Sequence, residues 1–227
     1  LKILSYLLEN KEVGGKKAID YFVDDNKISD QMVLADMKLA GTIPTDVVLF
    51  NIDSKSEVNG KQSKVAIVSV LQNVFNEMQG FSGSNPFLAD LERKLTEEGK
   101  YNLFKEKFED SFGSAWEESR SDFDFIQDDV VEVLDEIGFM SIEAGRNWCE
   151  KATGEYTYKV EDFARLVKKY LDKKESNHHI VFLIDEIGQY IGDDSKLMLN
   201  LQTVTEDLGT ACGGKAWIIV TLSLIHI

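Results

Sequence analysis

Three short apolar runs, separated by helical segments, constrain the fold of this 227-residue chain more than any other feature. The runs are TDVVLFNID at 45–53, HHIVFLIDE at 178–186 and AWIIVT at 216–221. Short runs rich in β-branched residues are typical of strands. Apolar strands that alternate with helices favour a mostly parallel sheet covered on both faces. We therefore predict an α/β fold.

The spacing of apolar residues also predicts the helices between these strands. The first helix is expected to end at Gly14 and Gly15, and a second is expected at 29–41, with Ser29 as N-cap and Gly41 as its end. Gly209 is expected to end the helix before the last strand. The remaining helices of this part of the chain are expected at about 61–79, 158–174 and 195–209.

Residues 82–150 are predicted to form an all-helical insert. Asn85 and Pro86 are typical of a helix start, and Phe104, Phe108 and Phe112 recur on one helical face. Residues 117–136 contain nine acidic residues and one basic residue. Such a run is typical of a solvated helix face, and a docking surface for a basic partner is the alternative.

Composition limits the classes of partner. The formal net charge is −15, which disfavours indiscriminate binding to nucleic acid or to an anionic membrane, although a local site for a phosphorylated ligand stays compatible with it. The sequence contains no apolar run of 18 residues, so no transmembrane helix is expected. Two cysteines, Cys149 and Cys212, fit neither a disulfide framework nor a metal pattern, and we expect reduced thiols in a cytoplasmic protein.

Two adjacent carboxylates follow the second apolar run. Ile180 to Ile184 lead directly into Asp185 and Glu186. Ligands of parallel sheets bind outside the carboxyl ends of the strands, so these acids are the leading candidate site residues. Successive side chains of a strand point in opposite directions, and we therefore expect the two acids to have different roles.

The apolar run followed by Asp-Glu resembles the Walker B motif of P-loop ATPases. That resemblance gives Asp185 the magnesium role and Glu186 the role of general base, with ATP and Mg²⁺ as cofactors. Magnesium prefers hard oxygen ligands, and a base has to reach the proton of the nucleophile. In the additional-strand (AAA+-like) class of these ATPases, a helix and a strand with a polar sensor follow, which implies Thr221 as a catalytic sensor residue. An ordinary strand residue is the alternative for Thr221.

Longer segments narrow the resemblance. The opening LKILSYLLENKEVGGKKAIDYF and the closing VFLIDEIGQYIGDDSKLMLNLQTVTEDLGTACGGKAWIIVT resemble the P-loop ATPases of BREX phage-defence systems, the BrxC/PglY family. The resemblance implies a three-layer P-loop NTPase-like domain in a cytoplasmic protein that works with other BREX components. It implies indirect action on phage or host DNA, leaves a homo-oligomer open and involves no membrane. An arginine finger from a neighbouring subunit would complete the site, and the candidates are Arg93, Arg120, Arg146 and Arg165.

The phosphate-binding loop GxxxxGK[ST] does not occur in the sequence. The stretch 58–63, VNGKQS, has Gln62 where Ser or Thr is required. We therefore expect the loop and its strand to precede Leu1, which makes the chain a fragment that by itself is inactive and exposes an apolar edge on the last strand. The final residues 222–227, LSLIHI, depart from the continuation that the family implies.

Two other functions remain open at the level of the sequence. One is a nucleotide-dependent switch without turnover, or a scaffold that docks partner proteins. The other is a metal-dependent phosphoesterase or nuclease, which would need more acids or histidines near the acidic pair. Asp193 and Asp194 are close in the sequence, whereas His178 and His179 lie at the other end of the strand, where a solvated pair is the simpler expectation.

Overall fold

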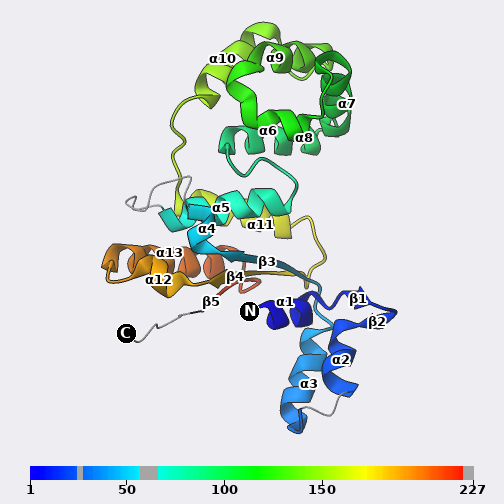
Figure 1. Cartoon of the computed structure of the whole chain (residues 1–227), viewed down its shortest axis with the longest axis vertical. Helices are drawn as coiled ribbons and strands as arrows, with labels where there is room; N and C mark the ends of the chain where they lie inside the picture. Colours follow the sequence, from blue (N-terminus) through cyan, green and yellow to red (C-terminus); the bar gives the residue numbers. More distant parts are fainter. Residues whose placement is uncertain (25–27, 57–65, 222–227) are drawn as a thin grey trace. The chain divides into compact units, whose positions relative to one another are not determined.

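The computed structural model describes residues 1–24, 28–56 and 66–221. The chain is a mixed α/β structure that is mostly helical, with a three-stranded parallel sheet and a two-stranded hairpin (Figure 1). It divides into two compact units. One combines residues 1–71 with the segment from Tyr158 onward, and the other is Gln72–Thr157. Within the described ranges, no helix is long and apolar enough to cross a membrane.

The parallel sheet of the first unit confirms the three predicted strands. Its order is β3 (Thr45–Asn51), β4 (His179–Asp185) and β5 (Ala216–Val220). Asn51 lies opposite Asp185 in the register of β3 and β4, and Ile184 lies opposite Val220 in that of β4 and β5. The carboxyl ends of all three strands therefore meet at one edge of the sheet.

The two faces of the sheet differ in cover. Val48, Phe50, Phe182 and Ile184 share one face and are buried, and Phe163 packs edge-on against Phe182 at 5.9 Å between ring centroids. The opposite face carries two exposed side chains, Leu49 at 40% and Trp217 at 54%. Val181 and Leu183 on that face are nevertheless buried, so the prediction of a sheet covered on both faces holds for one face and in part for the other among the described residues.

The three helices predicted around the sheet are present in the predicted order, whereas the short helices α4 (Ile52–Ser56) and α12 (Ile187–Ile191) were not predicted. Helix α4 follows β3. The described residues resume at Ala66, where helix α5 (Ala66–Met78) begins. Helix α11 (Val160–Leu171) precedes β4, and helices α12 and α13 (Ser195–Ala211) connect β4 to β5. Asp194 caps α13, which continues past Gly209 to Ala211, so the predicted stop at Gly209 is wrong. The turn instead uses Gly213 and Gly214, which have positive φ.

The N-terminal segment corrects two further predictions. Helix α1 (Lys2–Glu9) ends at Asn10, and Gly14 and Gly15 form the turn between strands β1 (Glu12–Val13) and β2 (Lys16–Lys17). Two successive residues with positive φ suit a tight hairpin, and glycine adopts them without a steric cost. Helix α2 (Ala18–Asp24) follows, and helix α3 (Gln31–Ala40) is capped by the Asp30 carboxylate and not by Ser29.

The second unit contains only helices among its elements, as predicted for 82–150. Asn85 caps α6 with Pro86 in its first turn, and Phe104 and Phe108 are buried on one face of α7, whereas Phe112 is partly exposed. The core also contains Trp116. The helices after the end of α5 are α6 (Pro86–Glu97), α7 (Tyr101–Phe112), α8 (Trp116–Ser119), the 3-10 helix η1 (Arg120–Phe125), α9 (Gln127–Glu136) and α10 (Ile142–Ala152).

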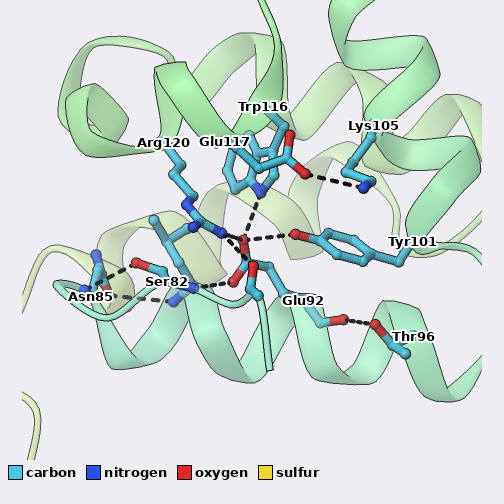
Figure 2. Close-up of polar contacts among 11 residues, drawn as sticks. Ser82, Asn85, Glu92, Thr96, Tyr101, Lys105, Trp116, Glu117 and Arg120 are labelled. Carbon is cyan, nitrogen blue, oxygen red and sulfur yellow. Dashed lines mark hydrogen bonds and ion pairs between the residues drawn. The ribbon is translucent and has the colours of Figure 1, made fainter. Parts of the chain in front are cut away.

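A buried carboxylate lies at the centre of this helical unit (Figure 2). Glu92 is fully buried and accepts hydrogen bonds from the Ser82 N–H at 2.6 Å, the Tyr101 hydroxyl at 3.0 Å and the Trp116 indole at 2.7 Å. Arg120 completes the set with an ion pair at 2.7 Å. A buried charge is tolerated only when it is paired and hydrogen-bonded, and these donors come from several segments of the unit. The carboxylate therefore joins those segments around one point.

Candidate functional site

Four polar side chains meet at the carboxyl edge of the parallel sheet. Asn51 ends β3, Asp185 ends β4, Glu186 follows it, and Thr221 follows β5. All four are half-buried. The structure thus brings together the three residues predicted from the sequence and adds Asn51. The central strand places the two acids between the ends of its neighbours.

Asp185 faces the end of β5. Its Oδ1 atom accepts hydrogen bonds from the Thr221 hydroxyl and from the Glu186 N–H, the latter at 3.1 Å. The Thr221 N–H extends the strand ladder by donating to the Ile184 carbonyl at 3.0 Å. The ladder therefore holds Thr221 beside Asp185, and the Thr221 hydroxyl also accepts from the Glu186 N–H at 3.2 Å.

Glu186 faces the end of β3. The Asn51 side-chain amide donates to Glu186 Oε2. The other end of that amide, Oδ1, accepts from the backbone N–H of Asp53 at 2.9 Å and of Ser54 at 3.4 Å. These backbone contacts cap the start of α4 and orient the Asn51 amide, so that its N–H group points to Glu186. The two acids therefore have different partners, as the sequence predicts.

The backbone of Glu186 is in the left-handed region, with φ 61° and ψ 23°. Among the described residues, Asn10 is the other non-glycine residue with positive φ. Asparagine tolerates this conformation well, whereas for a glutamate it costs about 1–2 kcal/mol. Strain of this kind concentrates at functional sites, because surrounding contacts have to maintain it. The turn moves the chain out of β4 and into α12, and it separates the Glu186 side chain from that of Asp185.

The site also has the charge expected of a cation site. Neither Asp185 nor Glu186 has an ion-pair partner among the described residues, and Asp185 Oδ2 accepts no hydrogen bond from them. A carboxylate oxygen without a protein donor is the ligand type that Mg²⁺ prefers. No group of three or more His, Cys, Asp or Glu side chains suited to a metal occurs in the described ranges. Asp185 therefore fits a magnesium ion that takes its other ligands from phosphate and water.

The candidate arginines differ in their contacts. Arg93 donates to Asp90 at 2.8 Å and to Asn76 at 2.6 Å, and Arg120 is paired with Glu92. Arg165 pairs with Asp162 on its own helix. Arg146 is exposed, and it has no hydrogen bond or ion pair to any residue in the described part of the chain. Arg146 is thus the candidate that a neighbouring molecule could use without breaking a contact seen here.

The two histidines lie at the opposite edge of the sheet from the acids, but they are not a solvated pair. The His178 side chain is 12% exposed and its Nε2 lies 2.7 Å from Asp46 Oδ2, which also accepts from the Tyr170 hydroxyl at 2.5 Å. Burial by itself would raise the pKa of Asp46, but these two hydrogen bonds, together with the charges of His178 and Lys174, outweigh it and lower that pKa. Burial also lowers the pKa of His179. This cluster belongs to the packing of β3 and β4.

Other residues singled out in the sequence have structural roles or lie outside the described residues. Asp194 caps α13 and Asp193 is exposed. Cys149 and Cys212 are buried free thiols, and burial raises the pKa of Cys149 to about 11. The stretch 58–63 and the tail 222–227 lie outside the described residues.

Comparison with known proteins adds no family to this geometry. No protein-family model matches the chain, and no solved structure is significantly similar to it. A functional conclusion therefore depends on the residues at the carboxyl edge of the sheet.

Proposed function

We propose that this chain is part of an ATPase domain that binds and hydrolyses ATP with magnesium. The observation that carries the proposal is the meeting of Asn51, Asp185, Glu186 and Thr221 at the carboxyl edge of three parallel strands. Ligands of open parallel sheets bind at this edge. The Walker B-like sequence and the strand order β3-β4-β5 agree with a P-loop NTPase-like fold of the AAA+-like class.

Each residue has a specific task in this proposal. Asp185 would hold the metal ion, which when bound would supply positive charge against the phosphates. Glu186 accepts a proton from the attacking water, and Thr221 maintains the orientation of Asp185. A phosphate-binding loop is also required, and it has to come from residues outside this sequence. The resemblance to BREX ATPases supports a role for the turnover in a phage-defence assembly.

Asn51 acts in the proposal as a positioning residue for Glu186. Its amide N–H neutralises part of the carboxylate charge and fixes its direction. Proton transfer then requires Glu186 to leave this contact or to take the proton while still held. Asn51→Asp tests the role, because it keeps the cap of α4 and replaces the donor with a like charge. We expect a pH–rate profile whose acidic limb moves to higher pH, with the fold unchanged.

The decisive experiment uses Glu186→Gln in a full-length protein that includes a phosphate-binding loop. Glutamine keeps the size of the side chain but accepts no proton, so ATP binding should persist while turnover falls by about 10²–10⁴-fold. Glu175→Gln is the matched control, because Glu175 is exposed and lies before β4. Unchanged turnover in Glu186→Gln would exclude the role of base, and absence of ATP binding in the parent protein would favour a scaffold function.

A further inference from the structure

A cavity lies within the helical unit, which does not contain the acidic pair. Its volume is about 250 Å³, and its walls include Phe87, Phe139 and Trp148 together with Asp90, Lys94 and Lys151. All of these residues belong to the compact unit Gln72–Thr157. Sites for drug-sized ligands are typically about 300–1,000 Å³, so this cavity suits a molecule with a single ring. Aromatic walls and charged groups occur together, and this combination is typical of a ligand site.

Local structure explains why these side chains converge. Phe87, Asp90 and Lys94 are three and four residues apart on α6, and such spacing places side chains on one face of a helix. Trp148 and Lys151 have the same relation on α10. After α9, Gly138 has φ 63°, and the Phe139 N–H donates to the Leu134 carbonyl at 2.9 Å. This helix-ending turn directs the chain so that Phe139 lines the cavity.

The aromatic walls are anchored to the core of the unit. Phe87, Phe139 and Trp148 are partly buried and pack against the hydrophobic core. Trp148 lies edge-on to the buried Phe123, with 5.6 Å between ring centroids, and Phe87 lies edge-on to Tyr156 at 5.0 Å. These contacts hold the rings in place before any ligand arrives, which reduces the entropy lost on binding.

Among the described residues, Lys94 and Lys151 lack an ion-paired acidic partner, although the helical unit is rich in carboxylates. Residues 72–157 contain 20 acidic and 8 basic side chains, a formal charge of −12. Despite this excess of carboxylates, the side chains of Lys94 and Lys151 have no hydrogen bond or ion pair to any described residue, although the charge of Lys94 acts on Asp90, four residues before it on α6. Four of the other basic side chains of the unit have an acidic partner within 3.1 Å: Arg93, Lys105, Lys107 and Arg120.

The lining favours an anion over a cation. Asp90 is already paired with Arg93 at 2.8 Å, so the charges of these two side chains offset each other. Lys94 and Lys151 then leave the cavity with a positive excess. Aromatic rings with a free carboxylate would suit a methylated ammonium group, but two ammonium groups at the same cavity oppose such a ligand. A ligand with an anionic group at the lysines and a ring between the aromatic walls would match both the positive charge and the aromatic lining of the cavity.

We propose that this cavity binds an aromatic carboxylate, with the ring against Phe87, Phe139 and Trp148 and the carboxylate at Lys94 and Lys151. The ligand chemistry could come from a small aromatic acid or from the C-terminal residue of a polypeptide. In both cases the features recognised are the same: one ring and one carboxylate a few bonds away. The site is independent of the nucleotide site proposed above, since none of its residues belongs to the sheet.

The test titrates the full chain, at a protein concentration at which light scattering detects no aggregates, with N-acetylphenylalanine and follows the indole N–H resonance of Trp148 by NMR. For a ligand of this size we expect a Kd of about 1 mM. N-acetylphenylalaninamide, which lacks the carboxylate, should bind at least 10-fold more weakly. Equal affinity for acid and amide, tighter binding of phenethylamine, or no binding at 10-fold the expected Kd would overturn the proposal.

Variants and a peptide complete the test. Lys94→Gln with Lys151→Gln should weaken binding of the acid at least 10-fold, whereas Lys107→Gln, a lysine paired with Glu136 outside the cavity, should leave it unchanged. Equal loss in the control would overturn the assignment of the two lysines. A tetrapeptide ending in phenylalanine distinguishes the sources: affinity at least equal to that of the free acid assigns a polypeptide end, and exclusion of the peptide assigns a small acid.

Discussion

At Glu186 the side chain is held by a specific contact, whereas the backbone conformation is one that glutamate disfavours. Its side chain has a donor from Asn51, while its backbone occupies a region that glutamate disfavours. A residue selected for the turn would be glycine or asparagine. The proposed role of base would explain why a glutamate occupies this strained position, and the strain makes the residue testable by stability as well as by turnover.

We predict that Glu186→Gly is more stable than Glu186→Ala by about 1 kcal/mol, because both lose the contact with Asn51 and only glycine relieves the positive φ. At an ordinary helical or extended position the order would be reversed. Thermal unfolding of the two variants measures the difference. A more stable alanine variant would show that the left-handed turn is not maintained in solution.

Asp46 provides a second prediction at the same scale. Its pKa in the folded protein is below the unfolded value of about 4, so its stabilisation is present above pH 4 and is lost as the pH falls through the folded pKa. Asp46→Asn should lower the urea midpoint at pH 7, and the gap to the parent should close below pH 4. Asp162→Asn, at an exposed position, should show a smaller gap at pH 7. A gap that stays constant down to pH 3 would contradict the role of Asp46.

At the scale of elements, regular patterns were predictable and specific contacts were not. The alternation of apolar runs and helical segments is enough to predict the strands β3, β4 and β5, because buried parallel strands have few other sequence forms. The sequence does not predict the end of α1 at Asn10. The apolar spacing continues to Leu8, and the hairpin that follows has only two residues in each strand. Ser29 and Asp30 are both good caps, and local sequence does not distinguish them.

The contact of Asn51 with Glu186 had no local signal. The two residues are 135 positions apart, and asparagine at the end of a strand is also a common turn residue. Only the register of β3 against β4 brings them together. A prediction of Asn51 would have required the parallel pairing first, followed by a comparison of the residues after each strand. The candidate site was therefore predictable along one strand, but not across the sheet.

The network around Glu92 gives the prediction for this scale. Glu92→Ala leaves Arg120 and Trp116 without their acceptor, and we expect a loss of about 3 kcal/mol in the free energy of unfolding. This value lies in the lower part of the range that is usual when a buried ion pair is broken, because Arg120 is 20% exposed and its charge is partly screened. Denaturant unfolding monitored by tryptophan fluorescence measures it. Glu106→Ala, at an exposed position of α7, should change stability by less than about 0.5 kcal/mol.

At the scale of the whole molecule, the parallel sheet leaves apolar surface exposed. Among the described residues, β5 pairs with a strand on one side only, and Trp217 on this strand is 54% exposed. Such edges promote association between chains. We predict that the 227-residue chain aggregates and that Trp217→Lys reduces light scattering at equal concentration. Phe125→Lys serves as the control, because Phe125 is 89% exposed but lies in the acidic helical unit. If Trp217→Lys and Phe125→Lys reduced light scattering equally, exposed apolar surface on β5 would be excluded as the specific cause of the aggregation.

The segregation of charge also restricts how copies of the chain can assemble. Of the formal charge of −15, −12 belongs to residues 72–157. Two helical units that met face to face would repel each other strongly, and salt would weaken this repulsion only beyond a Debye length of about 8 Å at physiological ionic strength. Contacts between two helical units are therefore unfavourable in any ring or dimer of this protein, and a positively charged partner would be attracted to this unit more strongly than to the rest of the chain.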